Sequence, residues 1–238
     1  MAKYQPTPII LAAEIISRRS VLLWGLIVGV AGCNKTANWE EAKITTRDGS
    51  NLATPRQTEG PFYPIKEQSD KDNDLTRVQG KLQQAQGEVI MVEGRVTDTN
   101  GRAIANVLVE IWQANTWGRY SHQRDPNAAP LDPDFQGWGQ TRSDAHGRYQ
   151  FKTIRPGAYP AGPGWTRPPH IHFKVSSPGY FPLTTQMYFP DQALNQDDLI
   201  LQNVPQTQQA MVIAKRQAGD DNGEPLFRFD IALLKKPE

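Results

Sequence analysis

Short runs of alternating apolar residues, each closed by a turn, constrain the fold of this chain more than any other feature. A strand shows the same face every second residue, so alternation over about four to eight residues predicts a strand. With 19 glycines and 19 prolines spread along the chain, long helices are disfavoured. We therefore expect an all-β fold, an antiparallel β-sandwich with long loops and one short helix. The expected strands are Val89–Gly101, Ile104–Gln113, Gly139–Ser143, Arg148–Ile154, His170–Ser176, Leu183–Phe189 and Leu226–Leu234.

Two turn motifs and one helical segment complete the expected topology. Asn100-Gly101 separates the first two runs, which is the signature of a β-hairpin. Asp144–Gly147 forms a second turn between the third and fourth runs. Only Gln206–Gln217 has the composition of a helix, and it is short.

The N-terminal residues have the pattern of an export signal. Arg18 and Arg19 precede the uncharged apolar run Val21–Gly32, and the only cysteine, Cys33, follows it. The run is shorter than the roughly 20 residues that span a bilayer. The arginine pair resembles a twin-arginine signal and the residues ending at Cys33 resemble a lipoprotein box. We expect residues 1–32 to be removed, Cys33 to carry lipid, and the protein to lie in the cell envelope on the periplasmic side; the alternative is a buried apolar helix.

Composition limits the partners of the remaining chain. We expect residues 33–53 to be a polar tether and residues 54–238 to be one domain. Lysine and arginine number 26 against 25 acidic residues, so nucleic acid is not an expected partner. Membrane contact is expected only through the lipid. A single cysteine forms no internal disulfide, so packing or a metal must stabilise the fold.

The sequence Pro169-His-Ile-His-Phe173 is the sharpest local sign of chemistry. In a strand, residues i and i+2 lie on one face with Cα atoms about 6.6 Å apart. His170 and His172 can then reach one metal ion, while Ile171 and Phe173 point into the core. The alternative is a pair of histidines that face solvent.

A His-x-His pair does not identify the metal. The cupin pattern begins in the same way but requires a glutamate where this chain has Ser176 and Ser177. A zinc hydrolase needs a third histidine or a carboxylate, and none is close in the sequence, although distant acids remain candidates.

Tyrosines accompany the histidine pair. Tyr120 follows the strand that ends near Gln113, and Tyr159 follows the strand that ends at Ile154. A phenol has a pKa of about 10, so only a strong Lewis acid holds it as phenolate at neutral pH. Two phenolates and one hydroxide would cancel the charge of Fe(III), and two neutral imidazoles would complete a five-coordinate site. Each tyrosine alone also fits an ordinary turn or core residue.

Several spaced motifs, in order, resemble the intradiol ring-cleavage dioxygenase family, most closely the protocatechuate 3,4-dioxygenase β-subunit type. The resemblance runs from about Thr54 to Leu234. It implies a non-haem Fe(III) ion held by four side chains, Tyr120, Tyr159, His170 and His172. It further implies that Tyr159 is the axial ligand, which leaves the metal when substrate binds. The motifs are Leu108–Asn115, Gly118–Tyr120, Leu131–Phe135, Gly147–Phe151, Pro156–Pro160 and Arg167–Phe173.

The resemblance also assigns residues to the substrate. It places Arg167 and Gln186 beside the substrate and Trp112 near the iron, and we expect Tyr63 to contact the substrate as well. On spacing alone, Arg167 fits a surface cation, and Gln186 and Trp112 fit ordinary strand residues. Ala161 stands where the protocatechuate enzymes tend to have tryptophan, which leaves the ring substituents of the substrate open.

The implied reaction cleaves a catechol between its two hydroxyl carbons with O₂ and gives a cis,cis-muconate, with protocatechuate as the first substrate to test. Gln57–Tyr63 resembles a segment that two-subunit relatives supply from their α-type chain, which implies a self-sufficient or homo-oligomeric enzyme. Two other functions remain open. A non-catalytic β-sandwich binding module tethered to the envelope would be colourless, and a zinc or manganese hydrolase would consume no O₂.

Overall fold

The computed structural model describes residues 52–66, 68, 70–219 and 222–237, all within one compact unit. The predicted export signal, the lipidation site at Cys33 and nearly all of the tether lie outside the described residues. No helix in the described ranges is long and apolar enough to cross a bilayer.

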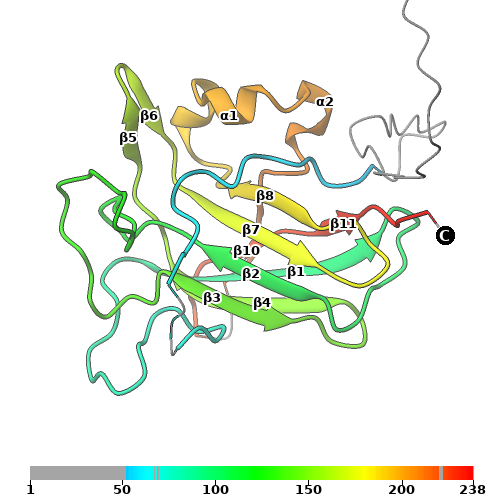
Figure 1. The fold of residues 1–238 in the computed structure, drawn as a ribbon, viewed down its shortest axis with the longest axis horizontal. Coiled ribbons are helices and arrows are strands. Elements are labelled where there is room, and N and C mark those ends of the chain that lie inside the picture. Colours follow the sequence, from blue (N-terminus) through cyan, green and yellow to red (C-terminus); the bar gives the residue numbers. More distant parts are fainter. Residues whose placement is uncertain (1–51, 67, 69, 220–221, 238) are drawn as a thin grey trace, which may run out of the picture. The chain divides into compact units, whose positions relative to one another are not determined.

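Two sheets form the sandwich (Figure 1). The first contains β1 (Val89–Asp98), β4 (Arg148–Ile154), β9 (Lys215–Arg216), β10 (Leu226–Arg228) and β11 (Ile231–Leu233). The second has the order β3-β2-β7-β8 and contains β2 (Leu108–Trp112), β3 (Trp138–Arg142), β7 (His170–Ser176) and β8 (Leu183–Tyr188). Strands β5 (Tyr159–Gly162) and β6 (Trp165–Arg167) form a separate hairpin, and the short helices are η2 (Ala193–Gln196), α1 (Leu199–Gln202) and α2 (Gln206–Gln209).

Side chains from alternate positions of the strands fill the space between the two sheets. Buried side chains occupy every second position over much of β1, and β2 follows the same rule in its first four residues. Since strand side chains alternate between faces, the inward faces of both sheets merge into one apolar core. That core includes Ile90, Val92, Val109, Ile111, Ile171, Phe173, Phe151 and Phe227. The predicted all-β sandwich is confirmed.

The predicted hairpin of the first two strands is correct in its turn but wrong in its strand pairing. Asn100-Gly101 does form a turn, and Thr97 pairs with Ala103 beside it. The chain then crosses to the other sheet, so β1 pairs with β4, β10 and β11 while β2 pairs with β3 and β7. The Asp144–Gly147 turn likewise joins β3 to β4 in the other sheet. The pairing of β1 with β10 and β11 is parallel, which the sequence did not predict.

The predicted helix Gln206–Gln217 is also wrong in length. Helix α2 ends at Gln209, and the chain then runs along the edge of β8. The Tyr188 N–H donates to the Val212 carbonyl at 2.8 Å, and the Ala214 N–H donates to the Tyr188 carbonyl at 2.9 Å. Pairing with a strand therefore replaces the helical bonds that this segment would otherwise make. Helices η2 and α1 were not predicted.

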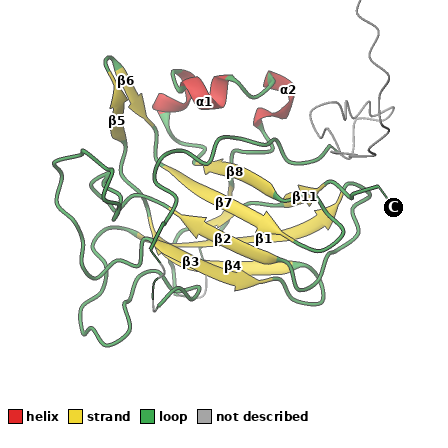
Figure 2. Cartoon of the chain, in the orientation of Figure 1, coloured by secondary structure: helices red, strands yellow, loops and turns green. Residues whose placement is uncertain are grey.

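Long loops gather at the end of the second sheet where β2 ends and β7 begins (Figure 2). At this end Trp112 pairs with His172, and His172 pairs with Gln186 of β8. The loops that follow β2 and β4 reach the same end, so residues distant in sequence meet there.

Candidate metal centre

Strand β7 places both histidines on the face that looks away from the main core. His170 and His172 are nevertheless buried, because the surrounding loops cover them. Ile171 and Phe173 lie within the apolar core on the opposite face. The predicted alternation across this strand is confirmed, and the alternative of solvent-facing histidines is wrong.

The two tyrosines and two histidines converge, and we call them the ligand cluster. The hydroxyl of Tyr120 lies 3.1 Å from His172 Nε2 and 3.4 Å from His170 Nε2. The ring of Tyr159 lies 5.6 Å from that of Tyr120 and 5.6 Å from that of His170, measured between centroids. All four side chains are buried. Two phenol oxygens and two imidazole nitrogens therefore share one small volume.

Two glycines allow the tyrosine-bearing turns to touch. A Cβ on Gly118 would lie 2.3 Å from the Ala158 carbonyl oxygen, and Gly118 has a φ of +79°. A Cβ on Gly157 would lie 2.5 Å from the Gly118 nitrogen. The carbonyl of Asn115 accepts from the N–H groups of both glycines, at 3.0 and 2.9 Å. Because no side chain separates the two turns, Tyr120 and Tyr159 approach each other.

Burial keeps the imidazoles in the form that binds metal. The pKa values of His170 and His172 are held well below the usual range, first by burial and then by the nearby charge of Arg167. His170 Nδ1 is 2.6 Å from the Pro168 carbonyl. A carbonyl oxygen only accepts, so the proton lies on Nδ1 and the lone pair is on Nε2, toward Tyr120.

The phenols need a cation before they ionise. Burial raises the pKa of Tyr120 well above its usual value, and the neighbouring Tyr159 raises it further. Burial also raises the pKa of Tyr159, while Arg167 acts in the opposite direction. Without a metal, both groups are therefore neutral phenols at pH 7.

The donor set fits a hard, highly charged metal ion. In the part of the chain that the structure describes, no group of three or more His, Cys, Asp or Glu residues is arranged to hold a metal. A metal in the ligand cluster must therefore use the phenol oxygens, which a zinc or cupin site would not require. The oxygen and nitrogen donors of this cluster suit Fe(III), whose charge would favour the phenolate forms.

Arg167 is a buried residue and lies next to the ligand cluster. It ends β6, and its Nη2 donates to Gln186 Oε1 at 2.7 Å. Gln186 in turn donates from Nε2 to the Thr58 carbonyl at 3.0 Å. The surface-cation alternative for Arg167 is therefore wrong. That Arg167 and Gln186 act on a substrate remains a prediction.

Trp112 and Tyr63 form a wall beside His172. The indole of Trp112 is stacked on the His172 ring, and the ring edge of Tyr63 meets Trp112 at 5.0 Å between centroids. The Tyr63 hydroxyl donates to Glu110 Oε1 at 3.2 Å, and the Lys174 ammonium lies 3.9 Å from its ring centre. In this structure Tyr63 thus uses its hydroxyl for Glu110, and its predicted contact with substrate stays a prediction.

An extended segment, Thr54–Tyr63, crosses the cluster, and we call it the strap. The Gln57 side chain accepts from the Gln186 N–H at 3.0 Å and donates to the Tyr188 hydroxyl at 3.1 Å. A Cβ on Gly60 would be 3.5 Å from His172 Cε1. At its start, Thr54 donates to the Ala232 carbonyl at 3.0 Å and accepts from the Ala232 N–H at 2.9 Å. The strap is therefore held by strands of both sheets.

Sequence reasoning missed three residues of this region. Phe62 packs with ring centroids 4.7 Å from Tyr120 and 6.4 Å from Tyr159. Tyr188 and Asp198 both bond Arg167. The aromatic residues of the strap did require something to pack on, which was a usable signal for Phe62. Asp198 lies in an aperiodic stretch and had no such signal.

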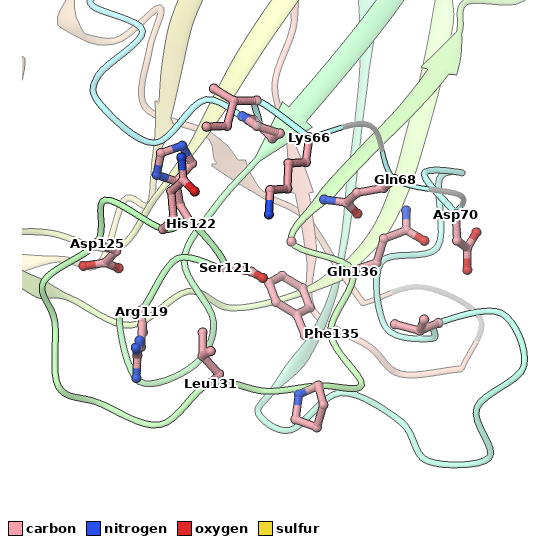
Figure 3. A pocket seen from close by; sticks show the side chains of 16 residues that line it. Lys66, Gln68, Asp70, Arg119, Ser121, His122, Asp125, Leu131, Phe135 and Gln136 are labelled. Carbon is pink, nitrogen blue, oxygen red and sulfur yellow. The ribbon is translucent and has the colours of Figure 1, made fainter.

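An outer cavity lies beside the loop that carries Tyr120. It has a volume of about 690 Å³, and its lining includes Lys66, Arg119, Ser121, His122 and Asp125 (Figure 3). A small neighbouring pocket shares Ser121 and His122 with it and reaches Tyr120 and Trp112. Neither pocket is lined by Arg167 or Gln186, so the outer cavity is distinct from the side of the cluster where those residues lie.

Comparison with known proteins identifies the family. A model of the family described as "Dioxygenase" matches residues 58–235. The chain is 44% identical to the protocatechuate 3,4-dioxygenase β chain of Burkholderia cepacia over 184 residues, covering 75% of this chain and 78% of that one. It is 31% identical to catechol 1,2-dioxygenase 2 of Acinetobacter lwoffii over 211 residues, covering 82% and 70% of the two chains.

Solved structures agree with the sequence matches. The dioxygenase domain of a carbohydrate-binding fusion protein from Streptomyces sp. SirexAA-E superposes with a TM-score of 0.58 at 28% identity, covering 78% of this chain and all of that chain. The 3-chlorocatechol 1,2-dioxygenase of Rhodococcus opacus gives a TM-score of 0.62 at 25% identity, covering 79% and 75%. The chain belongs to the intradiol ring-cleaving dioxygenase family and is an oxidoreductase.

Proposed function

We propose that this protein is an Fe(III)-dependent intradiol dioxygenase that cleaves a catechol with O₂ to a cis,cis-muconate. The observation that carries the proposal is the convergence of two buried phenols and two neutral imidazoles around the Tyr120 hydroxyl. The residues that would hold the ion are Tyr120, Tyr159, His170 and His172. When bound, Fe(III) supplies a Lewis acid and an electron sink for the catechol.

The side chains divide the remaining tasks. Tyr159 pairs with Arg167 across the β5–β6 hairpin, and the charge of Arg167 lowers the pKa of its phenol against the effect of burial. Its Oη, as phenolate, is suited to take a proton from a substrate hydroxyl. The guanidinium of Arg167 is permanently cationic and would stabilise negative charge on the ring. Gln186 accepts from Arg167 and donates to the Thr58 carbonyl of the strap, and these bonds orient Arg167.

Protocatechuate or a related catechol is the proposed substrate. The β chain from Burkholderia cepacia is named for protocatechuate, and other relatives are named for catechol. Ala161 lies exposed on the β5–β6 hairpin, and its small side chain leaves the ring substituent open. A substrate panel that varies the ring substituent is therefore needed.

One experiment tests the reaction and its metal together. The protein is reconstituted with Fe(III), its visible absorption is recorded, and O₂ uptake is followed with protocatechuate, catechol and hydroxyquinol. Phenolate-to-iron charge transfer should give a visible colour that shifts when catechol is added, and the product should be the muconate of the substrate consumed. The Tyr120→Phe variant, which loses a ligand but keeps the ring, should lose most of the colour and the activity.

The other two functions make opposite predictions in the same experiment. A binding module would remain colourless and would bind catechols without O₂ uptake. A zinc or manganese hydrolase would be nearly colourless and active without O₂. Either result with correctly folded protein would refute the dioxygenase proposal, and extradiol ring-opened products would refute the intradiol part alone.

We also propose that the chain is exported and anchored through lipid on Cys33, and that it works as a self-sufficient chain or a homo-oligomer. The sequence of the N-terminus supports the anchor, and the strap supports self-sufficiency because it covers the cluster of its own chain. Labelling with a radioactive fatty acid should mark the wild-type protein and not Cys33→Ser. Purified protein expressed without any second chain should be active, and its mass in solution gives the oligomeric state.

A further inference from the structure

Arg167 is joined to a carboxylate that sequence reasoning did not select. Asp198 has no exposed surface, and Arg167 is 3% exposed. Arg167 Nε donates to Asp198 Oδ1 at 2.9 Å, and Nη2 donates to Oδ2 at 3.1 Å. The two parallel bonds fix the plane of the guanidinium as well as its position.

Asp198 is itself held in place from two directions. It is the N-cap of α1, where its side chain accepts from the Leu201 N–H at 3.4 Å and its carbonyl accepts from the Gln202 N–H at 2.9 Å. Leu201 packs in a small apolar cluster with Tyr188, Val204 and Val212. The carboxylate thus has one position, set by the seating of α1 against β8.

The hydrogen bonds of Arg167 leave one nitrogen available. Nε is used by Asp198, and Nη2 is shared among Asp198, Gln186 and the Tyr188 hydroxyl, the last at 3.3 Å. Nη1 takes part in none of these bonds. Tyr159 pairs with Arg167 across the β5–β6 hairpin, and the charge of Arg167 lowers the pKa of its phenol against the effect of burial. Arg167 is therefore held beside the ligand cluster by partners that leave Nη1 unbonded among the described residues.

A buried ion pair is a poor device for stability alone. Desolvation of both charges offsets much of their attraction, so apolar residues of similar size often serve as well. A buried ion pair can also fix the orientation of a cationic side chain. Such a fixed orientation helps catalysis when the cation must stabilise negative charge that develops on a substrate.

We propose that Asp198 is a positioning residue for Arg167, fixing the plane and the position of the guanidinium beside the ligand cluster. This inference rests on the proposed function, in which Arg167 stabilises charge on the ring. It extends the site to helix α1, which contributes no member of the cluster.

The test compares Asp198→Asn, Asp198→Glu and a matched control. The asparagine variant keeps the size of the side chain but replaces one acceptor oxygen by an amide NH₂ group. This donor cannot accept a hydrogen bond from the guanidinium. The glutamate variant keeps the charge and both acceptors on a longer stem. Asp191→Asn is the control, because Asp191 also pairs with an arginine, at 2.6 Å, but is exposed and bonds Arg155 rather than Arg167.

The first readout needs no metal. The arginine Nε–H signals of the metal-free protein are recorded by ¹⁵N NMR, and the Arg167 signal is identified by its loss in Arg167→Lys. In wild type the Nε–H bonded to Asp198 should exchange slowly with water. Asp198→Asn should speed the exchange at least tenfold, Asp198→Glu should restore much of the protection, and Asp191→Asn should leave the signal unchanged.

The second readout is steady-state kinetics of the iron-loaded protein. Loss of an outer hydrogen-bonding partner typically costs 10- to 100-fold, so we expect kcat of Asp198→Asn to fall by about that factor. Iron content and the resting visible spectrum should remain as in wild type. Asp198→Glu should have a kcat between those of wild type and Asp198→Asn. Asp191→Asn should have the kcat of wild type.

The outcomes separate a positioning role from a structural one. Lower thermal stability with unchanged Arg167 exchange and unchanged kcat would overturn the inference. If Asp198→Asn does not fold, Asp198→Glu answers through the same two readouts: its longer stem should lower the protection of the Arg167 Nε–H and kcat together and only in part, and a fall in kcat with full protection would overturn the inference. If wild type itself cleaves no catechol, the proposed function fails, whereas the NMR comparison still decides whether Asp198 holds Arg167.

Discussion

Trp112 and His172 lie face to face, with ring centroids 4.7 Å apart and planes inclined by 12°. The pair results from the register of β2 and β7, which sets these two residues opposite each other. Stacking limits rotation of the His172 imidazole and so keeps its Nε2 directed toward the Tyr120 hydroxyl. His172 Nδ1 has no hydrogen-bond partner among the described residues, so the indole on its face and the Tyr120 hydroxyl at Nε2 restrain this ring.

Replacement of Trp112 should therefore loosen the metal site. Trp112→Ala should lower the free energy of unfolding by about 3–5 kcal/mol, as for other large buried aromatics. It should also weaken iron binding by roughly 10- to 100-fold because the ligand orientation is lost. Trp112→Phe should retain most of the affinity. Trp138→Ala is the control: Trp138 is buried in one apolar cluster with Trp112, but the ring stacked on His172 is that of Trp112, so stability should fall while iron affinity is kept.

Removal of Arg167 should affect the chemical step. Arg167→Ala should lower kcat by roughly 10²–10³, the usual cost of losing one donor to developing charge. Arg155→Ala removes a cation that pairs with Glu88 and Asp191 instead, and it should leave kcat unchanged. Stopped-flow measurement of a single turnover separates this effect from product release. An Arg167→Ala enzyme with wild-type kcat would refute the assigned role.

The contact between the tyrosine turns gives a backbone prediction. Gly157→Ala would place a methyl group 2.5 Å from the Gly118 nitrogen and the Thr116 carbonyl oxygen, so the turns must separate. We expect iron binding to weaken and the free energy of unfolding to fall by about 1–3 kcal/mol, as for other overpacked sites. Gly162→Ala is the control, because its nearest neighbour is 3.9 Å away and its φ is not in the left-handed region. Equal iron affinity in both variants would contradict the explanation.

The metal-free protein should lose stability in mild acid. Burial holds the pKa values of His170 and His172 well below 6.5, so the folded protein keeps them neutral when the unfolded chain already binds protons. The free energy of unfolding should therefore decrease as pH falls below about 6.5, by up to about 1.4 kcal/mol per pH unit for each histidine. The decrease stops once pH reaches the lowered pKa values.

Urea unfolding of the metal-free protein between pH 7 and 5.5 measures this slope. His172→Gln should remove one histidine's share of it. His146→Gln should leave the slope as in wild type, because His146 is exposed in a turn. A flat profile in the wild-type protein would mean that these imidazoles are not held neutral by burial.

Local patterns predicted a substantial part of the site. Alternation in β7 placed His170 and His172 together because the period of a strand is a property of the backbone. Motif order supplied Tyr120 and Tyr159, and the structure brings them to the same point. Asp198 was not predictable, since its role depends on contact with Arg167 across 31 positions of sequence and on a helix of only four residues.

Long-range pairing explains the errors in the fold. The Asn100-Gly101 turn was correctly placed, but the partners of β1 are chosen by packing with β4, β10 and β11. The helix expected over Gln206–Gln217 ends early because Val212 and Ala214 bond with Tyr188. In both cases pairing with a strand distant in sequence overrides the local preference.

The bonds between Thr54 and Ala232 set an order of events during synthesis. The ribosome makes the strap long before it makes β11, so the strap lacks this anchor until residue 232 has left the exit tunnel. A nascent chain arrested earlier would carry all four residues of the ligand cluster with the start of the strap not yet bonded. We therefore expect the strap to gain its last anchor only late in the biogenesis of the protein.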